Sequence, residues 1–148
     1  MNERSAVHNT FTIERVYKAS PAKVFTYWAD PLLKERWFSK ADEFDFRVGG
    51  RESSQGGPLG GPVFTFDARF HDIVSDERIV YTYTLDMDET RISVSATTIE
   101  FKPECGGTKL IFTEQGVFLD GHDTPAQREH GTNEMLDKLG VQLEEEQA

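Results

Sequence analysis

The stretch that decides the fold is NTFTIERVYKASPAKVFTYWADPLLKERWF, residues 9–38. In its first third, one side of the alternation carries Phe11, Ile13, Arg15 and Tyr17. A period of two is typical of a β-strand, so residues 9–19 are predicted to form one. Arg15 is the one charged member of this otherwise apolar set.

Two short helices are predicted directly after this strand. In SPAKVFTYW, Ser20 suits the N-cap and Pro21 suits the first helical position. ADPLLKERWF repeats the arrangement, with Asp30 as the cap and Pro31 after it.

From Glu43 to Gln115 the sequence is typical of short strands and turns, with GGPLGGP (56–62) as a flexible hairpin loop. Two strands present alternating apolar faces, made of Phe64, Phe66, Ala68 and Phe70 in one and of Ile79, Tyr81, Tyr83 and Leu85 in the next. In residues 91–101 the apolar parity changes, from Ile92, Val94 and Ala96 to Ile99 and Phe101, which predicts a bulge near 97–98. The last strand contains Phe112 and Glu114, and its inward face stays open.

A long helix is predicted at the C-terminal end. Thr124 and Gln127 form a capping-box pattern around Pro125. The apolar stripe of this helix consists of Met135, Leu136, Leu139 and Leu143. Gly140 interrupts it.

Composition narrows the class of protein. A length of 148 residues predicts a single domain, with an ordered core over 8–146 and frayed termini. The net charge of −10 argues against nucleic acid and anionic membranes as partners. The single cysteine, the polar start of the chain and the lack of a long apolar run predict a soluble, cytoplasmic protein without membrane insertion.

Four stretches together resemble one protein family: 19–38, 73–83, 108–121 and 128–140. They are similar to the SRPBCC or START-like superfamily, in the branch related to the C-terminal domain of the heat-shock protein 90 ATPase activator. The resemblance implies an α+β helix-grip fold, in which a curved antiparallel sheet wraps around the long C-terminal helix and encloses a cavity. It implies no invariant catalytic residue. Trp37 matches a position that is usually aromatic in the family, and Thr132 replaces a frequent tryptophan, which implies a roomier pocket.

The charged segment DGHDTPAQREH (120–130) contains residue types that can bind a metal ion. His130 and Glu134 share a helix face, but that face lies opposite the leucine stripe and should point to water. Asp123 before the helix is accounted for by the helix dipole. No metal ligand set and no cofactor are therefore predicted.

The inward face of the last helix begins with Arg128, Gly131 and Thr132 and only then becomes apolar. Two small residues and an arginine under aromatic strands suit a ligand site. The structural alternative is that Arg128 reaches the rim or pairs with Glu114. Arg15 is expected to pair with Glu114 as well; if both arginines face the cavity, a ligand with a carboxylate is expected.

Three functions remain open from the sequence. The first is the binding of a small hydrophobic or amphipathic, acidic or aromatic molecule, the second is an enzyme of cyclase or hydrolase type in the same cavity, and the third is a co-chaperone. For the enzyme, Tyr81, Tyr83 and Glu114 are the candidate proton-transfer groups. The loop at 56–62 is a candidate homodimer contact. The predicted ligand-binding residues are Arg128, Thr132, Gly131, Trp37, Phe66, Phe70, Tyr81, Tyr83, Phe112, Glu114 and Arg15.

Overall fold

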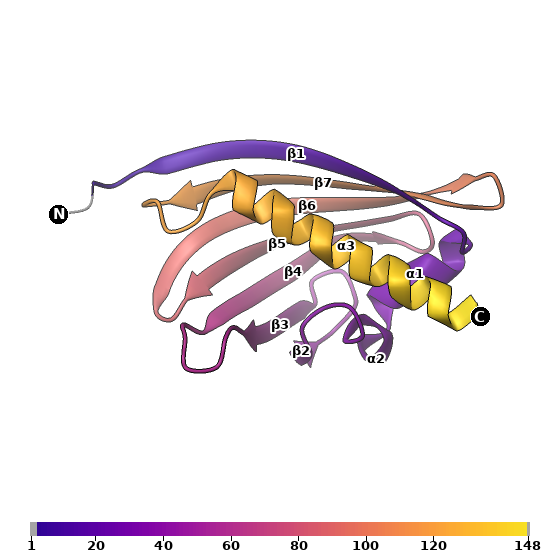
Figure 1. Ribbon diagram of the computed structural model, residues 1–148, viewed down its shortest axis with the longest axis horizontal. Coiled ribbons are helices and arrows are strands. Elements are labelled where there is room, and N and C mark those ends of the chain that lie inside the picture. Colours follow the sequence, from indigo (N-terminus) through magenta and orange to yellow (C-terminus); the bar gives the residue numbers. More distant parts are fainter. Residues whose placement is uncertain (1–2, 148) are drawn as a thin grey trace.

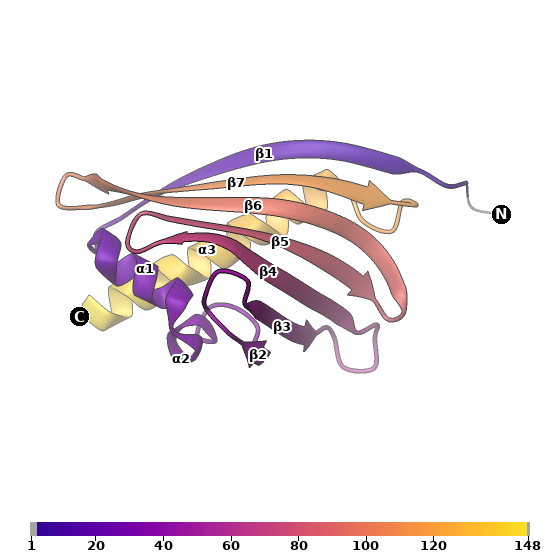
Figure 2. The same cartoon turned by 180° about the vertical axis from the view of Figure 1, so that it is seen from behind.

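The computed structural model describes residues 3–147 and has a single antiparallel sheet with three helices (Figure 1). The elements are β1 (Ala6–Tyr17), α1 (Pro21–Ala29), α2 (Pro31–Lys34), β2 (Ala41–Phe44), β3 (Arg51–Gly56), β4 (Phe64–Val74), β5 (Arg78–Met87), β6 (Thr90–Glu104), β7 (Gly107–Leu119) and α3 (Pro125–Gln147). The strands lie in the order β1-β7-β6-β5-β4-β3-β2. α3 crosses the concave face of the curved sheet, and Figure 2 shows the opposite face, which none of the helices within residues 3–147 covers. The predicted helix-grip fold is confirmed.

The helix starts follow from capping side chains. Ser20 Oγ accepts a hydrogen bond from the backbone N–H of Lys23 at 3.2 Å, and Asp30 Oδ1 accepts one from Leu32 at 2.9 Å. At the start of α3, Thr124 Oγ1 accepts from the N–H of Gln127 at 3.1 Å. These caps satisfy helix donors that have no partner inside the helix. The two short helices and the cap of the long one are where the sequence predicts them.

The main core lies between the concave face of the sheet and the helices. Leu136, Leu139 and Leu143 of α3 are buried, as the stripe predicts. The rings of Trp28 and Trp37 meet edge to face with centroids 4.5 Å apart, and Trp37 Nε1 donates to the carbonyl of Tyr27 at 3.0 Å. Trp37 thereby fixes the chain after α2 against α1.

The parity predicted for β6 was wrong. The residues of its first half that are buried on the concave side are Ser93, Ser95 and Thr97, whereas Val94 is 40% exposed. The extra residue that shifts the pairing with β5 is Ile92, next to the hairpin, and 97–98 pair regularly. Small polar side chains face inward here because they bind charged groups of the cavity, described below. In β7, for which the sequence did not decide the inward face, the side chains of Leu110, Phe112 and Glu114 are buried and form that face.

Two glycines of α3 have opposite surroundings. Tyr17 donates its hydroxyl hydrogen to the carbonyl of Leu136 at 2.8 Å, and a Cβ at Gly140 would lie 3.2 Å from the Tyr17 ring. A Cβ at Gly131 would have no neighbour within 4 Å. Gly140 therefore permits the close approach of α3 to β1, while Gly131 is required by no such contact.

We expect alanine at these two positions to change stability in opposite directions. Gly131→Ala should raise the free energy of unfolding by up to about 1 kcal/mol, because alanine favours the helix. Gly140→Ala should lower it by about 1 kcal/mol, because the hydrogen-bonded Tyr17 ring cannot move aside without loss. Urea denaturation of the two variants checks this. Stabilisation by both would show that the Tyr17 contact imposes no constraint.

Within residues 3–147 no helix is long and apolar enough to cross a membrane. Residues 1, 2 and 148, on which part of the prediction of frayed termini falls, lie outside the described part of the chain.

Candidate functional site

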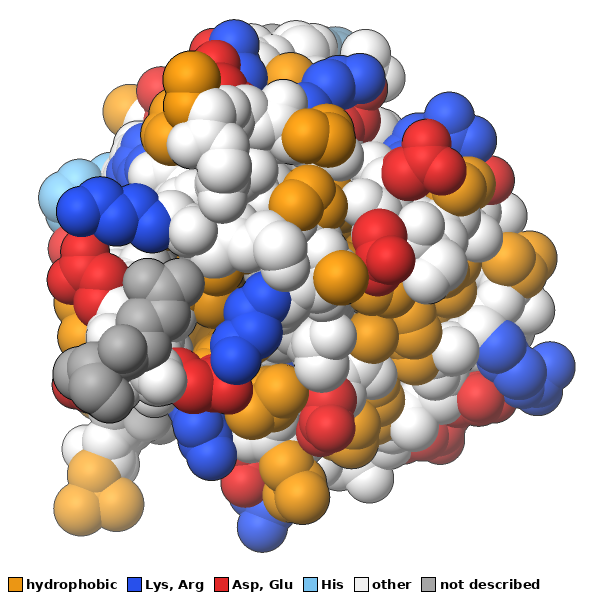
Figure 3. All heavy atoms as spheres, turned by 90° about the vertical axis from the view of Figure 1, so that its right-hand side faces the viewer, with side chains coloured by type: hydrophobic (Ala, Val, Ile, Leu, Met, Phe, Trp, Pro, Cys, Tyr) orange, Lys and Arg blue, Asp and Glu red, His pale blue; other side chains and the backbone are white. Residues whose placement is uncertain are grey.

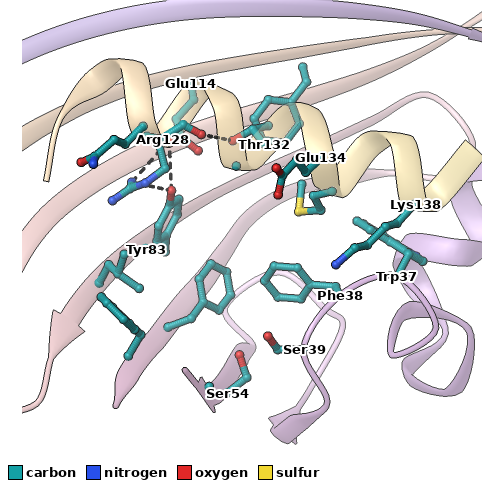
Figure 4. A pocket seen from close by; sticks show the side chains of 18 of the residues that line it. Trp37, Phe38, Ser39, Ser54, Tyr83, Glu114, Arg128, Thr132, Glu134 and Lys138 are labelled. Atoms are coloured by element: carbon teal, nitrogen blue, oxygen red, sulfur yellow. Dashed lines mark hydrogen bonds and ion pairs between the residues drawn. The ribbon is translucent and has the colours of Figure 1, made fainter. Parts of the chain in front are cut away.

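A cavity of about 640 Å³ lies between α3, the concave face of the sheet and the segment that follows α2 (Figure 4). Its aromatic walls are Trp37, Phe38, Phe64, Phe66, Tyr81, Tyr83 and Phe112. Leu85 and Met135 add aliphatic surface, and Ser39 and Ser54 lie at the end near β3. This volume is within the range of sites for small molecules.

The cavity exists because the first turns of α3 carry small side chains where they border it. Thr132 is buried and carries only a small side chain, and Gly131, which lines the cavity from its exposed side, carries none. Thr132 also turns its hydroxyl back, donating to the carbonyl of Arg128 at 2.9 Å. The pocket lies under the same turns at which the sequence predicts a gap.

One end of the cavity is closed by a polar network around Glu114, which is only 3% exposed. Glu114 Oε1 accepts a hydrogen bond from Thr97 Oγ1 at 3.0 Å, and Oε2 accepts one from the Tyr83 hydroxyl at 3.0 Å. Arg128 Nη1 lies 3.6 Å from Oε2. β5, β6, β7 and α3 each contribute to this network.

Arg128 is held by several partners besides Glu114. Its Nη1 donates to the Tyr83 hydroxyl at 2.8 Å, and its Nη2 donates to Ser93 Oγ at 2.8 Å and to Asp123 Oδ2 at 2.9 Å. The guanidinium also lies over the Phe118 ring, 5.0 Å from the centroid. With a side chain that is 10% exposed, Arg128 is a buried structural ion-pair partner as well as a cavity wall.

Burial shifts the titration of this network. It raises the pKa of the Glu114 carboxyl, although Arg128, Thr97 and Tyr83 oppose the shift. Burial also raises the pKa of the Tyr83 hydroxyl, and the nearby Glu114 carboxylate adds to that rise. The buried Tyr81 hydroxyl has its pKa raised by the same two causes.

A carboxyl whose pKa is higher in the folded chain holds its proton longer there. Its contribution to stability is therefore greatest at low pH and is lost as the pH rises through the raised pKa. Glu114→Gln mimics the protonated form, so we expect its stability relative to wild type to improve from pH 4 to pH 8, as measured by urea denaturation at each pH. Asp137→Asn is the control, and a Glu114→Gln difference that stays flat or worsens over this range would contradict the expectation.

All predicted site residues line the cavity except Phe70 and Arg15. Phe70 is buried in the core, where it contacts the ring of Phe46 with centroids 5.0 Å apart. It belongs to the same strand face as Phe66 but lies farther along β4, beyond the cavity.

The predicted ion pair between Arg15 and Glu114 was wrong. In the pairing of β1 with β7, Glu114 lies opposite Phe11, four residues away from Arg15 along β1. Arg15 instead reaches α3, where its Nη2 donates to Asn133 Oδ1 at 2.8 Å and to Asp137 Oδ1 at 3.1 Å. The expectation of an acidic ligand held by two arginines therefore loses its basis.

A second buried charge pair, which was not predicted from the sequence, lies behind the cavity wall. Lys34 Nζ binds Glu52 Oε1 at 2.5 Å, and both side chains are buried. The ammonium lies 5.1 Å from the centroid of the Phe38 ring, which lines the cavity. Within the described residues, Glu52 Oε2 and Trp28 Nε1 have no hydrogen-bond partner. In RESSQ, Glu52 and Ser54 alternate with their neighbours and so share one face of the strand. This alternation was the feature of the sequence that could have indicated that Glu52 is buried.

The charged residues around the start of α3 form surface contacts. His130 Nε2 and Glu134 Oε1 lie 2.8 Å apart with both side chains exposed. Among residues 3–147, no group of three or more histidine, cysteine, aspartate or glutamate side chains could hold a metal ion.

Glu134 also lies on the cavity rim, together with Glu35, Arg36 and Lys138. Figure 3, which views the side at which α3 ends, shows apolar side chains surrounded by charged ones.

The sequence profile of a known family, "Activator of Hsp90 ATPase homolog 1-like protein", matches residues 18–144, which include α1, all but the end of α3, and every residue that lines the cavity. The chain belongs to this family. The resemblance proposed from the sequence is thereby confirmed.

Solved structures of similar proteins share the whole architecture. A protein of Rhizobium leguminosarum is 44% identical with a TM-score of 0.90, and the match covers 97% of this chain and 99% of that one. Mll3558 from Rhizobium loti is also 44% identical, with a TM-score of 0.88 over 93% and 99% of the two chains. CV1439 from Chromobacterium violaceum is 28% identical, with a TM-score of 0.79 over 92% and 97%. No curated protein matches the chain.

Proposed function

We propose that this family member binds a small, mainly apolar molecule with an aromatic or alicyclic body in the cavity under α3. The observation that carries the proposal is a space of about 640 Å³ walled by aromatic rings and left open by Gly131 and Thr132. A concave site of this size, lined mainly by aromatic side chains with a few polar groups, is typical of small-molecule binding sites.

An enzyme in the same cavity is the second candidate, favoured by the raised pKa of Glu114. A buried carboxyl at a cavity wall suits proton transfer to or from a bound molecule, as in a cyclase-type reaction. Tyr83, hydrogen-bonded to it, would serve as the second proton-transfer group. Co-chaperone activity, homodimer formation and a cytoplasmic location stay predictions from the sequence.

Binding of a neutral fluorophore tests the proposal directly. N-phenyl-1-naphthylamine should bind wild-type protein saturably, with enhanced emission. Thr132→Trp, which fills the cavity, should weaken it at least about tenfold, since an aromatic side chain replaces the ligand's contacts. Glu129→Trp, on the exposed side of the same helix, is the matched control.

Two outcomes would overturn the proposal: no saturable binding to wild type, or equal binding by Thr132→Trp. Native against denatured mass of the purified protein then identifies any molecule that the cavity retains.

A further inference from the structure

The polar end of the cavity has little donor capacity left. Arg128 has five N–H groups, and those of Nη1 and Nη2 are directed at Tyr83, Ser93, Ser95 and Asp123. The Tyr83 hydroxyl hydrogen is donated to Glu114, and that of Thr132 to a backbone carbonyl. A ligand carboxylate would therefore find the Nη1 and Nη2 groups of Arg128, which form the fork for bidentate binding, already donating to protein partners.

The Glu114 carboxylate, at the same end of the cavity, can still accept a hydrogen bond. Each carboxylate oxygen accepts about two hydrogen bonds. Oε1 of Glu114 receives one, from the Thr97 hydroxyl, whereas Oε2 receives one from the Tyr83 hydroxyl and also lies 3.6 Å from Arg128 Nη1. Glu114 lines the cavity beside Thr132 and Phe112. A buried acceptor with unused lone pairs is best satisfied by a donor, and here the donor has to come from the cavity.

The charged residues at this end of the cavity also disfavour ligands that carry a charge there. A ligand anion at this end would lie beside Glu114 and Asp123, and the wider protein carries a net charge of −10. A ligand cation would meet Arg128, which is only 3.6 Å from Glu114. A neutral O–H or N–H group meets neither repulsion and still makes a hydrogen bond to a charged acceptor.

We propose that the cavity selects neutral molecules whose buried end carries a hydroxyl or N–H group, which donates a hydrogen bond to Glu114. The inference rests on the proposed function and specifies its ligand class. Figure 4 shows Glu114, Tyr83 and Arg128 together at one end of the pocket, so the donor is expected to point there and the apolar body to lie toward Phe38 and Trp37.

Three naphthalene derivatives with the same body test this selection. Each is used at pH 8 to displace N-phenyl-1-naphthylamine from wild-type protein. We expect 2-naphthol to bind about tenfold more tightly than 2-methoxynaphthalene, which lacks the donor, because a hydrogen bond to a charged group contributes about that much. 2-Naphthoate should bind most weakly.

The variant Glu114→Gln should reduce the advantage of 2-naphthol to less than about threefold, because the acceptor is no longer charged. Asp137→Asn, an equivalent change outside the cavity, should leave it unchanged. If Glu114→Gln does not fold, the ligand order on wild type still decides. Equal binding of 2-naphthol and 2-methoxynaphthalene, tighter binding of 2-naphthoate, or displacement by none of the three would overturn the inference while fluorophore binding stands. Failure of the fluorophore itself to bind would overturn the proposed function instead.

Discussion

Replacing Lys34 with methionine should lower the free energy of unfolding by about 3–5 kcal/mol, the largest effect expected of any change considered. Glu52 is 1% exposed, and its Oε2 already has no partner among the described residues. Loss of the ammonium would leave a buried carboxylate without compensation, since Oε1 would lose its partner as well. Urea denaturation at pH 7 measures the loss.

The double variant Lys34→Met with Glu52→Leu distinguishes two contributions to the free energy of unfolding: the loss caused by an unpaired buried carboxylate and the net stabilisation by the intact ion pair. Replacing a whole buried ion pair by apolar side chains is often neutral or stabilising, so the double variant should recover most of the loss. Lys109→Met, which removes the partner of Glu14 on the surface, is the control and should leave the urea midpoint nearly unchanged. A loss below about 1 kcal/mol in Lys34→Met would show that the Glu52 carboxylate does not depend on the ammonium for its burial.

Arg128→Met should cost about 3 kcal/mol, the second-largest loss. The change removes the common partner of Glu114 and Asp123 and leaves the hydroxyls of Tyr83 and Ser93 without their donor. Arg128→Lys should recover only part of the loss, because one ammonium cannot reproduce the planar fork that reaches partners on both sides. Thermal and urea unfolding of the two variants measure both effects.

Arg15→Met is the matched comparison for this prediction. Arg15 also joins a strand to α3, but its partner Asp137 is mostly exposed, so a loss below about 1 kcal/mol is expected. Equal losses in Arg15→Met and Arg128→Met would mean that the polar network contributes no more than a surface contact.

Much of the fold could be predicted because its signals are local. The alternation around Phe11 and Ile13, the two cap–proline pairs and the leucine stripe of α3 each depend on residues a few positions apart. The small residues at the start of α3 likewise predicted a gap in the packing, which is where the cavity lies.

The errors came from residues whose partners lie far along the chain. Ser93, Ser95 and Thr97 look like an outward face until the charged side chains that they bind are known. The partner of Arg15 depends on the register of β1 against β7 and on how α3 crosses the sheet, neither of which is encoded by periodicity. The burial of Lys34 and Glu52 depends in the same way on α2 packing over β3.

The position of β1 at the edge of the sheet has a kinetic consequence. Among the described strands it neighbours β7 alone, so Ala6 pairs with Leu119 and Tyr17 with Thr108, whereas each of β2 to β6 pairs with the next strand in the chain. During synthesis the first strand therefore stays unpaired until nearly all the others have emerged, and the helix that covers the aromatic face comes later still. Closing so long a loop is slow. The folding rate should depend on β1 joining β7, and a nascent chain that has not yet reached α3 exposes its aromatic concave face to chaperones and to other chains.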